Sequence, residues 1–170
     1  MSDRPDIDEM IKWLEAHGPD EWHRVANSWN FDNDDRVLNW IVDNPKCDKA
    51  TALDIFWLCA PDYSLGFKDR DAIMAQAAYN VVAYDLSTKI VNNWQAGRYK
   101  TALFATEQVS PDYVAGYESQ EVAIGQVNLP WIIPADMRKP IVGKELDCSG
   151  YAEGYAPELA ARLEELGIRF

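Results

Sequence analysis

Hydrophobic residues recur at helical spacing along most of this chain, with charged and polar residues between them. Spacings of three and four residues place apolar side chains on one face of an α-helix. Between Ala52 and Ala60 only Asp54 is polar, so we expect that helix to lie at the centre of the fold. The pattern predicts helices over residues 7–17, 19–29, 32–44, 48–59, 70–96 and 156–167, and a shorter one over residues 102–108.

Short polar side chains mark where several of these helices begin. Asp48 and Asp69 precede apolar runs, and their carboxylates are predicted to accept hydrogen bonds from the free backbone N–H groups of the first turn. Asp6, with Glu9 three residues later, predicts a capping box for the first helix. The acids of residues 32–35 are predicted to open the third helix, because the helix dipole favours negative charge at that end.

Residues 109–155 have a different character, because prolines and glycines interrupt them too often for long regular elements. We predict an irregular flap there, with short strands over residues 122–127 and 131–133 and room for a short β-hairpin. The predicted fold class is therefore mostly all-α. It is a compact multi-helix domain over residues 1–170, with a Pro/Gly-rich segment before its terminal helix.

Composition supports a folded, cytoplasmic protein. A chain of 170 residues with 48% hydrophobic residues fits one domain with a substantial core. It has no apolar run of about 20 residues, so no membrane-spanning helix is predicted. The acidic start lacks the basic and apolar regions of a signal peptide. The cysteines are an odd set of three, and we expect them to be reduced.

The formal net charge of −12 bears on the kind of partner. Residues 1–62 hold 14 acids and 6 bases, whereas residues 63–170 hold 14 acids and 10 bases, so the N-terminal third carries most of the charge. Repulsion disfavours nucleic acid and anionic membranes as partners, and a basic protein is favoured. Solubility alone is the simpler explanation of the same charge.

No pattern in the chain predicts a catalytic residue, a metal site or a cofactor. His17 and His23 belong to no metal-binding spacing and are expected to be exposed or capping residues. Ser149 lacks the glycine that a nucleophile elbow needs before it, and Cys148 has no base assigned to it. The acids of residues 32–35 do not form a calcium loop, because Arg36 stands where a ligand would be.

Two groups of side chains are the candidates for binding a partner. The first is acidic, and the second is aromatic, since tyrosine and tryptophan are enriched at interface hot spots. Those aromatic residues are also ordinary core residues, so this second assignment stays open. The predicted partner-binding residues are Asp32, Asp34, Asp35, Asp43, Asp62, Tyr63, Tyr113, Tyr117 and Trp131.

Four short stretches carry a resemblance to a known family. They are Trp29-Asn30, residues 38–41, residues 45–48 and residues 50–57, with the run Cys47-Asp48-x-x-Thr51-Ala-Leu as the most specific part. Over roughly residues 22–79 the chain resembles a bacterial domain of unknown function, family 4274. The resemblance implies no activity. Proteins of this sort look like those found beside bacterial polymorphic toxins.

These observations favour a binding protein over two alternatives. The leading hypothesis is a cytosolic inhibitor, in particular an immunity protein that neutralises a cognate bacterial toxin, because blocking a site needs shape and charge but no reactive groups. The first alternative is an enzyme whose site no motif identifies, which a pocket of converging, perturbed acids or histidines would favour. The second is a structural or oligomerisation module.

Overall fold

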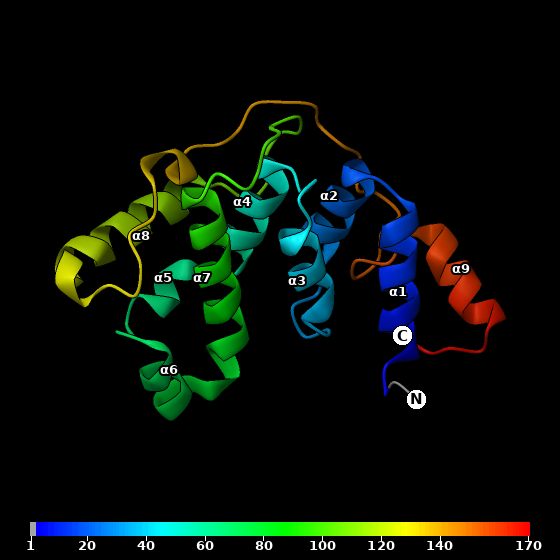
Figure 1. Cartoon of the computed structure of the whole chain (residues 1–170), viewed down its shortest axis with the longest axis horizontal. Coiled ribbons are helices and arrows are strands. Elements are labelled where there is room, and N and C mark those ends of the chain that lie inside the picture. The colour runs from blue at the N-terminus through cyan, green and yellow to red at the C-terminus, as the bar shows by residue number, and fades with distance from the viewer. Residues whose placement is uncertain (1–2) are drawn as a thin grey trace.

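The structure is a computed structural model that describes residues 3–170, and these residues are mostly α-helical with no β-sheet (Figure 1). The predicted fold class is confirmed. Three 3-10 turns accompany the α-helices: η1 (Ala78–Asn80), η2 (Gln126–Asn128) and η3 (Ala135–Arg138). The α-helices are α1 (Pro5–Ala16), α2 (Pro19–Ser28), α3 (Arg36–Asp43), α4 (Lys49–Leu58), α5 (Pro61–Ser64), α6 (Arg70–Ala77), α7 (Val81–Gln95), α8 (Pro111–Ile124) and α9 (Pro157–Glu165).

The helices lie side by side along the longest axis of the molecule (Figure 1). Helices α9 and α1 pack together at one end, and α5 packs against α8 at the other. Between them, α1 contacts α3, α2 packs on α4, and α4 packs on α7. None of the helices within residues 3–170 combines the length and the apolar character that crossing a membrane requires.

Helix α4 is the centre of the packing, as its almost uniformly apolar sequence predicted. Ala52, Leu53, Ile55 and Phe56 are fully buried. Asp48 caps the helix through a hydrogen bond of 3.0 Å from the backbone nitrogen of Ala50, and this predicted cap is confirmed. A central helix of this kind contributes to the core on all its faces, which explains why it is not amphipathic.

Two buried carboxylates of α4 hold a neighbouring extended segment, residues 101–108. Asp48 Oδ2 accepts a hydrogen bond of 2.8 Å from the backbone nitrogen of Leu103. Asp54 Oδ1 accepts bonds of 3.0 and 2.9 Å from the backbone nitrogens of Glu107 and Gln108. The helix predicted over residues 102–108 is therefore wrong, because these backbone groups bond to α4 and to Lys144 rather than to one another.

The long helix predicted over residues 70–96 is interrupted. Helix α6 ends at Ala77, where φ is −150° and ψ is 54°, and the 3-10 turn η1 connects it to α7. Helix α6 then packs against α7 instead of continuing it, which buries Ile73 and Ala77. The predicted start of α6 is confirmed, since Asp69 accepts a hydrogen bond of 2.9 Å from the backbone nitrogen of Ala72.

Residues 109–155 begin with a regular element that the sequence reading did not predict. Pro111 opens α8, where its missing N–H costs nothing at the first helical position. The strand predicted over residues 122–127 is wrong, because these residues form the end of α8 and most of η2. Residues 131–133 are irregular rather than a strand, and no hairpin forms in the described part of this region.

The first and third helices begin differently from the prediction. Asp6 lies inside α1, where its carboxylate accepts bonds from Arg4 and from the hydroxyl of Tyr155, so no capping box forms with Glu9. Helix α3 begins only at Arg36, and the acids before it form a turn. The terminal helix α9 lies within its predicted range.

An extended segment, residues 139–155, joins the two ends of the molecule, and we call it the C-terminal arch. It leaves η3 beside α8 and crosses above the other helices to reach α9 (Figure 1). Gly143 packs against the segment 101–108 so closely that a Cβ there would lie 2.6 Å from the oxygen of Leu103. At the far end, Trp13 Nε1 donates a hydrogen bond of 3.2 Å to Glu158.

Candidate protein-binding surface

The turn that ends α4 contains a strained residue. Helix α4 stops at Leu58 and Pro61 begins α5, so only two residues, Cys59 and Ala60, connect the two helices. Ala60 takes a left-handed conformation there, with φ of 48° and ψ of 63°. This conformation costs a residue with a Cβ about 1–2 kcal/mol, and such strain concentrates at functional sites. Ala60 and Glu153 are the two non-glycine residues of the described chain at positive φ, and the hollows beside Ala60 make its turn the candidate for a binding surface.

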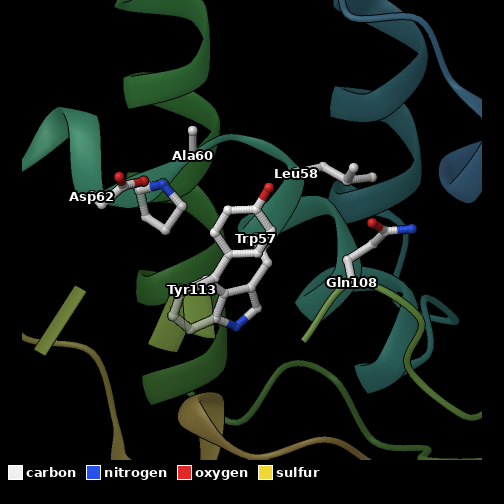
Figure 2. A pocket seen from close by; sticks show the side chains of 7 residues that line it. Trp57, Leu58, Ala60, Asp62, Gln108 and Tyr113 are labelled. Carbon is white, nitrogen blue, oxygen red and sulfur yellow. The ribbon is translucent and has the colours of Figure 1, made fainter. Parts of the chain in front are cut away.

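Two adjoining hollows flank Ala60 and share it with Leu58. The first has a volume of about 160 Å³, and its wall includes Asp62, Gln108 and Tyr113 (Figure 2). The second has a volume of about 260 Å³. Its wall includes Phe31, Asp32, Tyr79 and Val82. Elements far apart in the sequence thus converge on one turn.

Exposed aromatic side chains surround these hollows. Tyr79 is 80% exposed and Tyr113 is 68% exposed, and Tyr63 and Phe31 are partly exposed. The hydroxyl groups of Tyr63 and Tyr79 contact each other, and their ring centroids are 6.3 Å apart. Large apolar side chains at a protein surface mark interaction sites when they gather around a hollow. We call this surface the Ala60 face, made up of Phe31, Asp32, Leu58, Ala60, Asp62, Tyr63, Tyr79, Val82, Gln108 and Tyr113.

The structure brings only some of the predicted acids to the Ala60 face. Asp32 and Asp62 line the two hollows. Neither has an ion-pair partner within residues 3–170, so their negative charge is available to a ligand. Asp34 pairs with Arg36 at 3.0 Å in the turn before α3. Asp43 pairs with Lys89 at 2.8 Å at the other end of α3.

Asp35 is exposed, and its carboxylate accepts a hydrogen bond of 3.0 Å from the side chain of Asn39 on α3.

The predicted aromatic residues fall into an exposed pair and a buried pair. Tyr63 and Tyr113 belong to the Ala60 face, but Tyr117 is fully buried and Trp131 is 7% exposed. Their role as surface contacts is thus corrected. Tyr117 packs against Trp57 in the core, and Trp131 against Tyr84, so these rings stabilise the fold.

Behind the first hollow lies a buried polar network that sequence reasoning missed. His23 is fully buried, so the expectation of an exposed or capping residue is wrong for it; His17 does occupy the C-cap of α1. His23 Nδ1 lies 2.9 Å from Thr51 Oγ1, and its Nε2 lies 3.8 Å from Asp54 Oδ2. Asn27 Nδ2 donates a hydrogen bond of 3.0 Å to that same carboxylate oxygen.

Burial sets the protonation of this network. It lowers the pKa of His23 from 6.5 to about 4, and it raises the pKa of Asp54 from 3.8 to about 6. At neutral pH the imidazole is therefore neutral, and the carboxylate is mainly ionised. Hydroxyl, imidazole and carboxylate in this order are the groups of a nucleophilic triad. However, Thr51, His23 and Asp54 are all fully buried and line neither hollow.

The network reaches the Ala60 face through one residue, Gln108. Its Nε2 donates a hydrogen bond of 3.1 Å to Asn27 Oδ1, and its backbone nitrogen donates to Asp54. The sequence contained one signal for this arrangement, namely the single acid in an otherwise apolar helix. Tyr79 was missed because the pattern of residues 70–96 predicted one unbroken helix, whereas Tyr79 lies in the 3-10 turn η1 between α6 and α7.

The remaining candidate chemistry finds no site in the described structure. Within residues 3–170, no group of three His, Cys, Asp or Glu side chains is placed to hold a metal ion. Cys47, Cys59 and Cys148 are all free thiols. Burial raises the pKa of Cys59 to about 12 and that of Cys148 to about 11, so both stay protonated at neutral pH.

Comparison with known proteins gives one match. Residues 17–96 match the family model described as Domain of unknown function (DUF4274). The matched segment runs from the end of α1 through α7, and so contains the central helix, Ala60 and the turn that bears Tyr79. No curated protein and no solved structure matches the chain.

Proposed function

We propose, on the premise that residues 17–96 are a DUF4274 domain, that this chain is a protein-binding inhibitor that covers a basic site on its partner. The observation that supports this most is the Ala60 face. It combines two acids that have no ion pair among residues 3–170, four exposed aromatic side chains and two hollows at a strained turn. Aromatic anchors with carboxylates beside them suit a tight interface with a basic protein.

The partner that fits best is a bacterial toxin, and the inhibitor is then its immunity protein, acting in the cytoplasm. An acidic cover blocks the basic cleft of an enzyme that cuts nucleic acid or uses nucleotides, because it competes for the charges that hold the substrate. The resemblance to proteins found beside polymorphic toxins agrees with this proposal. The net charge of −12 supports fast association with such a partner.

Co-expression with the protein encoded next to this chain tests the proposal. That neighbour should be toxic alone and harmless when this chain is present, and the two should co-purify. The double variant Asp32→Asn/Asp62→Asn should lose protection. A matched control, Glu164→Gln/Glu165→Gln, removes two exposed charges near the end of α9, at the opposite end of the molecule, and should still protect. A harmless neighbour, or one that stays lethal with this chain present, contradicts the proposal.

The enzyme alternative has one observation in its favour, the convergence of His23 and Asp54 with perturbed pKa values. Both side chains have no exposed surface, so a substrate reaches them only if residues 101–108 detach from α4. His23→Gln separates the two hypotheses. An inhibitor keeps its protective effect as long as the variant stays folded, whereas an enzyme that uses this imidazole loses its activity.

A further inference from the structure

We propose that the hollow between Asp62, Gln108 and Tyr113 receives an arginine side chain of the basic partner. This inference rests on the proposed function, since it names the chemical group that the Ala60 face recognises. It is carried by the orientation of Gln108, the free charge of Asp62 and the aromatic wall of the hollow.

The first step concerns the amide of Gln108, whose orientation follows from the buried network. Asp54 is a hydrogen-bond acceptor, so the Asn27 group that lies 3.0 Å from it must be the NH₂ group. Asn27 therefore presents its oxygen to Gln108, and Gln108 donates its own NH₂ group at 3.1 Å. The oxygen Oε1 of Gln108 is left over, and it accepts no hydrogen bond from residues 3–170. The hollow thus has an acceptor of known orientation in its wall.

The second step concerns charge. Asp62 is half-buried at the start of α5, and it has no ion pair within the described residues. Figure 2 shows Asp62 and Gln108 on opposite sides of the hollow, with Tyr113 between them. The wall of the hollow therefore carries both a negative charge and a hydrogen-bond acceptor. That arrangement disfavours a carboxylate or phosphate and favours a cation with several donors.

The third step concerns shape. Trp57 forms part of the wall, and its indole is held by a hydrogen bond of 2.9 Å to the oxygen of Met137. Tyr113 is 68% exposed and also lines the hollow. A guanidinium is flat, stacks on aromatic rings and carries donors on both edges. An ammonium is a compact point charge without this planar fork. The volume of about 160 Å³ accommodates a side chain but no folded element.

The experiment is an NMR titration of the full chain with N-acetyl-arginine methylamide as the probe. We expect saturable shifts of the side-chain NH₂ of Gln108 and the indole N–H of Trp57. N-acetyl-citrulline methylamide, which has nearly the same shape but no charge, should give no saturable shift. The variant Asp62→Asn should weaken arginine binding about fivefold, the upper range for a pair near the surface. Glu165→Gln should leave it unchanged.

Three results overturn this inference: no saturable shift with the arginine probe, equal shifts with citrulline, or equal affinity for N-acetyl-lysine methylamide. The outcome is separate from that of the proposed function. If the arginine probe binds while the neighbouring protein is not neutralised, the hollow is assigned and the inhibitor proposal fails. If the neighbour is neutralised while the probe leaves Gln108 unmoved, the inhibitor proposal stands and the arginine assignment fails.

Discussion

Asp54 Oδ1 lies 2.9 Å from the backbone nitrogen of Gln108, so a buried carboxylate of α4 sets the conformation of a residue at the protein surface. The same carboxylate holds the backbone of Glu107 and the side chain of Asn27. One acid in the core therefore connects the packing of α4 to the geometry of the Ala60 face.

Replacing Asp54 by asparagine should loosen residues 105–108 without unfolding the chain. One of the oxygens becomes an NH₂ group, which cannot accept hydrogen bonds from backbone nitrogens. We expect a loss of about 1–3 kcal/mol in the free energy of unfolding, measured by urea denaturation. Hydrogen exchange at Glu107 and Gln108 should accelerate more than exchange in α1. Uniform acceleration along the chain would contradict this local role.

The pH dependence of stability should also change in Asp54→Asn. Burial raises the pKa of Asp54 to about 6, so its contribution to stability falls as pH rises from about 4 to 6. Burial lowers the pKa of His23 to about 4, so its contribution rises as pH goes from about 4 to 6.5. In the natural chain the two contributions oppose each other. In the variant the stability should drop more steeply on acidification from pH 6.5 to 4. If the curves of unfolding free energy against pH are parallel for the natural chain and Asp54→Asn, the predicted opposition of the two groups is refuted.

Tyr113 and Tyr117 lie one helical turn apart in α8 and should separate binding from stability. Tyr117→Ala removes a fully buried ring and should cost about 3–5 kcal/mol of unfolding free energy. Tyr113→Ala removes an exposed ring and should change stability by less than about 0.5 kcal/mol, yet weaken binding to the partner. Thermal unfolding and a pull-down with the neighbouring protein measure the two effects. A stable Tyr113→Ala variant that binds normally would remove this ring from the interface.

Ala60→Gly tests whether the strain at the α4–α5 turn serves binding. Glycine adopts a φ of 48° without a Cβ clash, so relief of strain should stabilise the fold by up to about 1 kcal/mol. Ala60 lines both hollows, so we expect removal of its methyl group to weaken the complex even though the fold gains stability. The unfolding midpoint measures the change in stability, and the dissociation constant of the complex measures the change in binding. A variant with lower stability would show that the turn is not strained by its Cβ.

Association with the basic partner should slow as salt concentration rises, because mobile ions screen the attraction between opposite charges. The rate constant measured by stopped flow should therefore fall between low and high ionic strength. Asp32→Asn/Asp62→Asn should flatten this dependence, whereas Glu164→Gln/Glu165→Gln should flatten it less, because those acids lie away from the Ala60 face. A rate that does not respond to salt argues against electrostatic steering.

The helices that were predicted well are those whose local signals agree with their packing. Helix α4 has a capping aspartate, an apolar body and a following proline, and all three act as expected. The break after Ala77 has no glycine or proline to announce it. There, burial of Ile73 against α7 outweighs the preference of the sequence for one long helix.

The candidate site was predictable only in part. Asp62, Tyr63 and Tyr113 were identified because acids and exposed aromatics favour interfaces. Tyr117 is a tyrosine of the same Pro/Gly-rich segment as Tyr113, so the sequence does not distinguish the two. Only the packing of α8 against the core shows that Tyr117 is buried and Tyr113 exposed. Gln108 could not be predicted from the sequence, since its role depends on hydrogen bonds with Asn27 and Asp54 that join three separate segments.

The C-terminal arch has a consequence for how the chain is made. Tyr155 bonds to Asp6, and Trp13 to Glu158, across separations of 149 and 145 residues. On the ribosome α1 is thus synthesised long before α9, so the part of α1 that α9 covers stays open to solvent while the residues between them are made, whereas α3 can pack against another part of α1 much earlier. Loop closure over such a span is late and entropically costly. Until α9 is released, the nascent chain therefore exposes the part of α1 on which α9 packs, and that surface is open to aggregation and to chaperones.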